Sequence, residues 1–204
     1  MNTQQVNFSS LYFGTPVAIV SSQNADGTTN LSPISSWWIL GKSIIFGLGK
    51  SGKCYENLQQ NADIVLNIPD ARLWEHVEAM ADITGKEHVP DIKKKKMGYR
   101  SEKNNFLCSD LTEVNSLDVG PGRIKECPVQ IEARVVRGMS LGEYTEEMVS
   151  MEARIIRTHV SEKLLYCNDG KITFNVEEWK PLYYIFRHYF SSGEHFGKNF
   201  RCHE

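Results

Sequence analysis

The chain of 204 residues has neither a long apolar run nor a marked excess of charge of one sign. No stretch approaches the roughly 20 apolar residues that a helix needs to cross a bilayer. The formal net charge of −2 is too small to indicate a strongly charged partner, whereas nucleic-acid-binding proteins usually carry a basic face. We therefore expect neither a membrane nor a nucleic acid as a partner.

Cysteines are few and scattered. There are five: Cys54, Cys108, Cys127, Cys167 and Cys202. The number is odd and no two form a Cys-x-x-Cys pair, which fits neither a disulfide framework nor a zinc site. Residues 1–10 are polar and do not have the pattern of a signal peptide. These features predict a cytoplasmic protein with reduced thiols and without a metal site.

What the chain does have is an ordinary globular composition, 41% apolar and 24% charged, at a length that suggests one domain. Short runs rich in β-branched residues predict strands. They cover residues 16–22, 28–40, 43–48, 63–68 and 183–186. Asp26-Gly27 and Asn168-Asp169-Gly170 are typical of tight hairpin turns.

Alternation of apolar and polar residues predicts further strands at 127–135 and 151–155. A period of two over this length is typical of half-buried antiparallel strands. Short helices are expected at 53–60, from Asp70 to Met80, and near 92–99, while 84–122 is poorly periodic. Leu73, Trp74, Val77 and Met80 form an apolar stripe that predicts core contacts. The fold class is therefore mainly β with short helices, an α+β protein built on a β-barrel.

A glycine-rich stretch follows the strand at 43–48 and precedes the first helix. Gly47-Leu48-Gly49-Lys50-Ser51-Gly52 matches Gly-x-Gly-x-x-Gly, and the continuation Lys53-Cys54 nearly completes a P-loop. However, Cys54 is a poor ligand for the magnesium ion of a P-loop. Asp70 lies about 20 residues beyond the glycines, as a dinucleotide-binding fold requires, but that fold also needs a parallel βαβ unit. Both nucleotide interpretations are minor alternatives.

The same stretch also permits a phosphate site. Glycines let the backbone approach a ligand, and successive N–H groups form an anion-binding concavity. Lys50 and Lys53 add positive charge, and Ser51 is placed to cap the helix that begins near Lys53. On these residues alone, a phosphate site and a plain strand-to-helix turn with solvated lysines remain equally open.

A second polar segment is Asn30-Leu31-Ser32-Pro33-Ile34-Ser35-Ser36-Trp37. Buried polar groups need partners, so hydroxyls within a strand indicate either a ligand surface or an exposed edge. A flavin ring and its ribityl chain require many neutral donors and acceptors, which this segment supplies. Taken alone, the segment favours the exposed strand.

Together, these segments resemble the flavin reductase-like branch of the FMN-binding split barrels. The matching residues are Pro16-Val17-Ala18-Ile19-Val20-Ser21-Ser22, Asp26-Gly27 with Asn30, Ser35-Ser36, Lys50-x-x-Lys53 and Asn57-Leu58. The resemblance continues less specifically through 61–67 and 126–132, and 186–190 looks like the tail of flavoredoxin-like members. It covers nearly the whole chain, with the middle segment least matched.

The resemblance implies a single split-barrel domain over 1–204, with a helical and loop excursion at about 70–122. It implies a homodimer with one FMN per subunit near the interface, and hydride transfer from NADH or NADPH to flavin N5. The alternative is an FMN-binding electron carrier, flavoredoxin-like, that a partner protein reduces. Some members supply reduced flavin to a monooxygenase. Because the cofactor carries the difficult chemistry, no catalytic residue is nominated.

By the residue matches, two groups of residues would bind FMN. The flavin ring and ribityl chain would lie against Asn30, Ser32, Pro33, Ser35, Ser36 and Trp37. The phosphate would lie among Gly49, Lys50, Ser51 and Lys53, with Asn57 in support. His188 is a further candidate for contact with a nicotinamide or a partner's flavin, although a structural role is the more ordinary interpretation.

The sequence departs from the family at two points. Many reductases carry Pro-Pro where Gly41-Lys42 stands here, and Trp37-Trp38 replaces smaller residues. These departures leave open the electron acceptor. The choice between NADH and NADPH, and whether flavin is a substrate or a bound cofactor, are also open.

Overall fold

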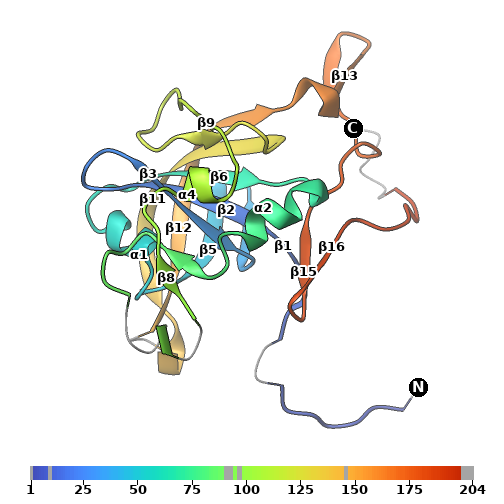
Figure 1. Ribbon diagram of the computed structural model, residues 1–204. Coiled ribbons are helices and arrows are strands. Elements are labelled where there is room, and N and C mark those ends of the chain that lie inside the picture. Colours follow the sequence, from blue (N-terminus) through green and yellow to red (C-terminus); the bar gives the residue numbers. More distant parts are fainter. Residues whose placement is uncertain (1, 9–10, 90–93, 96–97, 145–146, 199–204) are drawn as a thin grey trace.

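A computed structural model describes residues 2–8, 11–89, 94–95, 98–144 and 147–198. A seven-stranded antiparallel sheet, in the order β3-β2-β6-β11-β12-β5-β4, dominates it (Figure 1). Its strands are β2 (Ala18–Gln23), β3 (Thr29–Ile34), β4 (Trp37–Leu40), β5 (Ser43–Gly49), β6 (Asp63–Ile68), β11 (Val129–Ser140) and β12 (Met148–Val160). The predicted mainly β class is confirmed, and the antiparallel sheet excludes a dinucleotide-binding βαβ unit.

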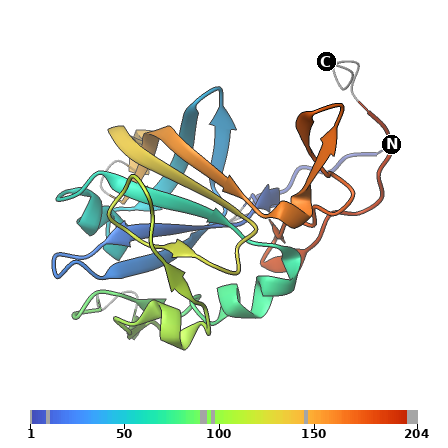
Figure 2. The ribbon, with the colours of Figure 1, turned by 90° about the horizontal axis from the view of Figure 1, so that it is seen from above.

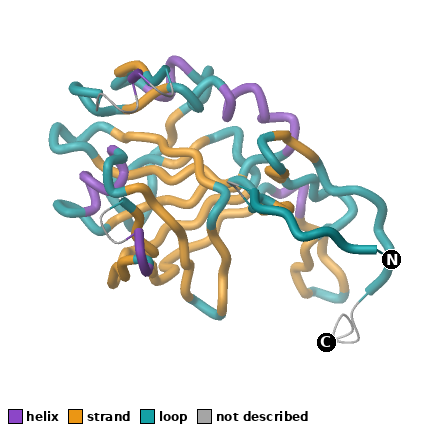
Figure 3. The backbone as a smooth tube through the Cα atoms, turned by 90° about the horizontal axis from the view of Figure 1, so that it is seen from below, coloured by secondary structure: helices purple, strands orange, loops and turns teal. Residues whose placement is uncertain are grey.

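The two edges of this sheet approach each other, because edge strands β3 and β4 are consecutive in the chain. The Trp37 indole of β4 donates to the carbonyl of Pro16, which precedes β2, at 2.8 Å. The Gly47 N–H donates to the Ser36 carbonyl at 2.8 Å and extends the β4–β5 pairing by one residue. Helix α1 (Lys53–Leu58) contacts both β3 and β5. The strands form a curved sheet (Figure 3), and the barrel is split between β3 and the end of β5, which extends past its pairing with β4.

The prediction of one continuous strand over 28–40 was wrong. The chain leaves β3 after Ile34 and begins β4 at Trp37, on the opposite edge of the sheet. Pro33 lacks an N–H group and is suited to an edge strand. The apolar residues before and after the break hid a turn that only Ser35-Ser36 marks in the sequence.

Alternate strand residues divide between two apolar cores. Along β2, Ala18 and Val20 belong to the barrel interior, whereas Val17 and Ile19 belong to a second core on the outer face. This division follows from the two-residue period of a strand. The sheet is therefore covered on both faces at β2.

The excursion forms this outer cover rather than leaving the barrel. Figure 2 shows it on one side of the curved sheet. It contains η1 (Ala71–Leu73), α2 (Trp74–Glu78), β7 (Ile83–Thr84), β8 (Arg100–Ser101), α4 (Asn105–Cys108), β9 (Glu113–Val114) and β10 (Arg123–Ile124). Val77 and Met80 are buried as the apolar stripe predicted, but Trp74 is exposed. Of the short helix expected near 92–99, residues 92–93 and 96–97 lie outside the described ranges.

Because of this cover, β11 is buried on both faces at its start, not half-buried as its alternation predicted. Glu132 has no exposed surface. Its carboxylate accepts hydrogen bonds from the N–H groups of Leu117 (2.9 Å) and Asp118 (2.6 Å), and lies 2.7 Å from His159 Nε2. These partners make the burial of a charged group tolerable.

The C-terminal part adds a projecting hairpin and a small sheet. β13 (Leu165–Asn168) and β14 (Lys171–Phe174) turn at Asp169 and Gly170, whose φ angles are 50° and 78°. The predicted turn is therefore confirmed, and the hairpin stands away from the barrel in Figure 1. β1 (Phe13–Pro16), β15 (Tyr183–Ile185) and β16 (His188–Phe190) form the small sheet, and η2 (Gly142–Tyr144) and η3 (Glu162–Leu164) are single turns. Among the described residues no helix could span a membrane.

Candidate functional site

The split between β3 and β5 holds a cavity of about 250 Å³. One wall is β3 from Asn30 to Ile34, another is the end of β5 and the start of α1, and the third is the segment after α2. Five predicted site residues line it: Asn30, Ser32, Pro33, Gly49 and Lys53. The split in the barrel thus brings together residues from both predicted groups.

Asn30 forms part of this cavity and is almost fully buried. Its Nδ2 donates to Ser32 Oγ at 3.1 Å, while its Oδ1 has no hydrogen-bond partner among the described residues. A buried acceptor without a donor costs about 1–3 kcal/mol. This oxygen has almost no accessible surface and faces Gly85, so a ligand N–H or O–H group could satisfy it only if this wall moved slightly.

Gly85 lets the excursion come close to Asn30. A Cβ atom at this position would lie 2.4 Å from Asn30 Oδ1 and 3.1 Å from Lys53 Cγ. The first distance is shorter than any real Cβ contact, so Asn30 would have to shift, and the second would require Lys53 to give by a few tenths of an ångström. A glycine is therefore required where this wall closes.

Two lysines meet at one carboxylate beside the cavity. Lys53 Nζ lies 2.5 Å from Glu56 Oε1, and Lys86 Nζ lies 3.1 Å from Glu56 Oε2. The hydrogen bond from Lys53 is the main cause of a lowered pKa at Glu56, which stays ionised at neutral pH. The cluster carries a net charge of +1 and offers unused ammonium donors to a phosphate.

The glycine turn contributes less backbone to an anion site than the sequence indicated. The Lys50 N–H donates to the Glu147 carbonyl at 2.8 Å, and the Gly52 N–H donates to the Gly49 carbonyl at 2.9 Å. Helix α1 begins at Lys53 as predicted, but its N-cap residue is Gly52, without a side-chain cap from Ser51. Ammonium groups, rather than a run of free N–H groups, supply the positive charge here.

Six other predicted residues lie outside the lining of this cavity: Ser35, Ser36, Trp37, Lys50, Ser51 and Asn57. Trp37 packs on the barrel core. Lys50 Nζ reaches Ser140 Oγ at 3.4 Å, and Ser51 is exposed. Asn57 is buried and donates to Ser22 Oγ (3.1 Å) and Asn24 Oδ1 (2.9 Å), so it ties α1 to the end of β2.

Cys54 lines the cavity but is not a nucleophile. Burial raises the pKa of its thiol to about 12, against the opposing effect of a hydrogen bond with Ser22. Because the thiolate is the reactive form, Cys54 contributes packing. It is one of four described cysteines that are free thiols.

The sequence did not identify the wall that the excursion supplies. This segment lines the cavity with Met80, Ile83, Thr84, Gly85 and Tyr99. Lys86 is the residue next to Gly85. The segment has no regular hydrophobic period, and it meets β3 only through the fold. The one local signal was a glycine within a polar stretch.

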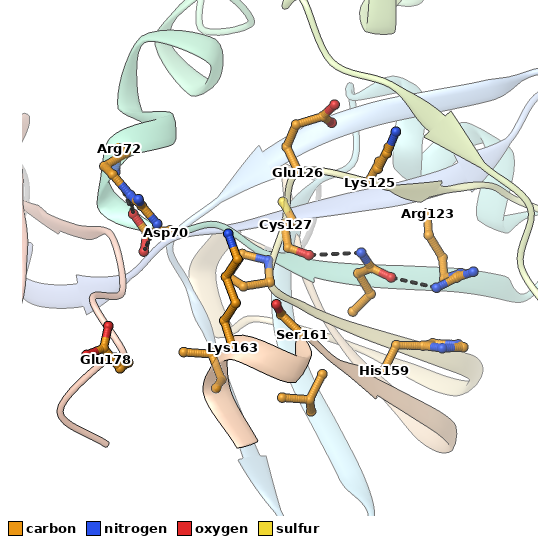
Figure 4. Close-up of a pocket in the computed structure, with 14 residues that line it drawn as sticks. Asp70, Arg72, Arg123, Lys125, Glu126, Cys127, His159, Ser161, Lys163 and Glu178 are labelled. Atoms are coloured by element: carbon orange, nitrogen blue, oxygen red, sulfur yellow. Dashed lines mark hydrogen bonds and ion pairs between the residues drawn. The ribbon is translucent and has the colours of Figure 1, made fainter. Parts of the chain in front are cut away.

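A larger cavity, of about 580 Å³, lies at the end of the barrel where β11 begins and β12 ends. Asp70 and Arg72 border it on one side in Figure 4, and Arg123 and His159 on the other. Its charged groups are mostly engaged within the protein: Arg72 pairs with Asp70, and Arg123 donates to Gln130 and to the Asn115 carbonyl. None of the predicted flavin-binding residues lines this cavity.

Comparison with known families gives one match across most of the chain. The family model "Flavin reductase like domain" matches residues 9–192. An uncharacterized protein of Bacillus subtilis (strain 168), YdfE, is 40% identical over 191 residues, which are 94% of this chain and 90% of that protein.

Solved structures share the fold. Flavoredoxin of Desulfovibrio vulgaris (Miyazaki F) superimposes with a TM-score of 0.77 at 18% identity, over 100% of both chains. Nitrilotriacetate monooxygenase component B from Bacillus cereus gives a TM-score of 0.70 at 24% identity, over 91% of this chain and 88% of that one.

Proposed function

Since the chain belongs to the flavin reductase-like domain family, we propose that it is an FMN-binding oxidoreductase that reduces flavin with NADH or NADPH. The observation that carries this proposal is the cavity at the split of the barrel. It combines a buried acceptor without a donor, on Asn30, with a lysine pair held by Glu56. FMN carries neutral hydrogen-bond donors on its ring and ribityl chain, which suit Asn30, and a phosphate at its other end, which suits the lysine pair.

Two groups of residues would hold FMN. Lys53, with Lys86 beside it, would offset the charge of the phosphate. Asn30, Ser32 and Pro33 would lie along the ribityl chain and the ring. In this proposal Ser35 and Ser36, which connect β3 to β4, and Trp37, which begins β4, border the ring outside the cavity.

The cavity of about 250 Å³ is smaller than complete small-molecule pockets, which run from about 300 to 1,000 Å³. Part of the ligand would therefore extend beyond it. A second copy of the chain would cover this part, which is why we propose a homodimer with FMN near its interface.

When bound, FMN would supply the redox chemistry, with the nicotinamide as the hydride donor. The chain's own residues bind, orient and exclude water. Lys53 fixes the phosphate end, Asn30 accepts a hydrogen bond from the ligand, and the apolar side chains of Met80 and Ile83 keep water from the wall. No side chain is required to transfer a proton in this proposal.

The phosphate assignment is tested by titrating the protein with FMN and with riboflavin, which lacks the phosphate. Lys53→Gln should weaken FMN binding about tenfold, because a charge-assisted hydrogen bond is worth about 1.5–3 kcal/mol. Riboflavin affinity should not change. Lys42→Gln, at an exposed lysine outside the cavity, is the matched control. Equal losses for both flavins in Lys53→Gln would contradict the assignment.

The second candidate is an electron carrier that keeps FMN bound and receives electrons from a partner protein. The complete superposition on a flavoredoxin favours it. Steady-state oxidation of NADH or NADPH with free FMN as acceptor separates the two functions. Rapid oxidation of the nicotinamide supports the reductase. Such a reductase can serve a monooxygenase partner only if it releases the reduced flavin. If only a partner protein reduces the bound FMN, the carrier is supported.

A further inference from the structure

A cavity of about 620 Å³ lies between α2 and the β15–β16 hairpin. It shares no lining residue with the cavity at the split of the barrel. In Figure 1, α2 and the β15–β16 hairpin lie toward one side of the molecule and α1 toward the other. The proposed flavin site therefore does not account for this second cavity.

Its lining presents aromatic faces that remain accessible. Trp74 is 44% exposed and Phe190 is 50% exposed. The ring of Tyr189 lies 6.1 Å from that of Trp74, at an interplanar angle of 41°. Such rings are large apolar surfaces that stack on other planar rings.

Tyr189 is held in place. Its hydroxyl donates to Glu78 Oε2 at 3.0 Å. Burial and the hydrogen bond with Glu78 raise the pKa of Tyr189, so the hydroxyl remains a donor. Glu78 is the carboxylate among the described residues that line the cavity, and one of its oxygens accepts this hydrogen bond from Tyr189.

A strained turn brings positive charge to the same cavity. Phe186 and Arg187 have φ angles of 44° and 71°. Two-residue hairpin turns of this kind usually use Asn and Gly, because other residues are strained at positive φ. Phe186 packs against Phe8 and Phe13, at 5.5 and 4.9 Å between ring centroids, which fixes the turn. Strain that the surroundings maintain is common at binding sites.

The turn leaves Arg187 and His188 exposed on the lining. Within the part of the chain that the structure describes, Arg187 makes no ion pair. A guanidinium is suited to phosphate because it presents several donors in one plane. The cavity therefore pairs stacking surfaces with a cation that forms no ion pair among the described residues, although the Glu78 carboxylate lies on the same lining.

We propose that this cavity is a second ligand site, which binds a planar aromatic ring carrying a phosphate, as in a mononucleotide. The ring stacks against Trp74 and Phe190, and the phosphate binds Arg187 with His188 beside it. The site is independent of the flavin cavity and does not rest on the proposed function.

The test uses ADP and adenosine as probes, titrated by calorimetry into the full-length protein with FMN present in excess. Because FMN is itself a planar ring with a phosphate, the titration is repeated with one equivalent of FMN, which fills the flavin cavity first, and the Trp74 and Arg187 variants assign the nucleotide signal to the second site. Trp74→Ala should weaken ADP binding about tenfold, the loss expected when a stacked base loses its aromatic partner. Trp38→Ala, at another exposed tryptophan that does not line this cavity, should leave it unchanged.

Arg187→Gln should weaken ADP binding about fivefold or more and leave adenosine binding unaltered, because adenosine lacks the phosphate. The proposal is overturned if ADP does not bind saturably, or if Trp74→Ala binds it as well as the wild type does. It is also overturned if a second copy of the chain covers Trp74 and shields its fluorescence from acrylamide.

Discussion

At the residue scale, the cavity proposed for flavin depends on a buried polar side chain, that of Asn30, and on a glycine, Gly85. Asn30 holds an acceptor without a donor, and Gly85 closes the wall beside it. The two residues lie far apart in the sequence and meet only because the excursion packs over β3. A small change at either position should therefore act on binding before it acts on folding.

Gly85→Ala tests this dependence. The new Cβ would lie 2.4 Å from Asn30 Oδ1, so Asn30 and the ligand it binds must shift. We expect FMN affinity to fall about tenfold or more, measured by quenching of flavin fluorescence, because a displaced polar contact of this kind costs about 1–3 kcal/mol. Gly193→Ala, whose Cβ meets no atom within 4 Å, is the control. Unchanged FMN affinity in Gly85→Ala would place the ligand elsewhere.

Glu132 illustrates a different residue-scale effect. Burial would raise the pKa of this carboxyl, but the N–H groups of Leu117 and Asp118 and the hydrogen bond with His159 together hold it below its ordinary value. The carboxylate thereby fixes the segment around residues 117–118 to the outer face of β11. Its contribution to stability must depend on pH.

The sign follows from proton linkage. Because the folded-state pKa of Glu132 is lowered from 4.5, the unfolded chain binds more protons once the pH falls below the unfolded value. The stabilisation is complete above that value and is lost as pH falls through the folded pKa. We expect Glu132→Gln to cost about 2–4 kcal/mol at pH 7. The difference from wild type, measured by urea unfolding, should shrink toward pH 3; a constant difference would contradict the account.

At the scale of elements, the strands with regular patterns were predictable. β5, β6, β11 and β12 follow from β-branched runs or alternation, and the β13–β14 turn follows from Asp169-Gly170. The break between β3 and β4 was not, because apolar residues continue on both sides of Ser35-Ser36. Burial on both faces of β11 was also missed, since Gln130 and Glu132 look like solvent-facing residues.

Only part of the candidate site could be predicted from the sequence, because some of its residues belong to local motifs and others do not. Asn30, Gly49 and Lys53 belong to local motifs at the ends of β3 and β5, and the fold brings them to one cavity. Gly85 and Lys86 belong to no motif and come from the excursion. Asn57 has the family spacing but supports β2 rather than lining the cavity. Contacts between distant segments carry no local signal.

The β15–β16 turn gives an element-scale prediction. Arg187 has a φ of 71°, a conformation that costs a side-chain-bearing residue about 1–2 kcal/mol and that glycine adopts freely. Arg187→Gly should therefore raise the free energy of unfolding by about 1 kcal/mol in urea titrations, while ADP binding weakens. Loss of stability would show that the turn is not strained, and unchanged ADP binding would remove Arg187 from the second site.

At the scale of the whole molecule, the fold places two cavities with different linings in different parts of the protein. The split of the barrel holds the cavity that we propose for FMN, and the outer cover meets the β15–β16 hairpin at the aromatic cavity. The excursion contributes a wall to each of them: the segment from Met80 to Gly85 lines the first, and Ala71, Trp74 and Glu78 line the second. The central claim concerns the first cavity, and one spectrum addresses it.

That measurement is the absorbance of the purified protein, reconstituted with FMN and freed of unbound flavin, from 300 to 550 nm. It is recorded without oxygen before and after addition of NADH and then NADPH. We predict flavin bands in the protein fraction that bleach with at least one of the two nucleotides. Bands that persist with both would exclude direct reduction by a nicotinamide and favour the carrier. A colourless protein that retains no FMN would contradict the account.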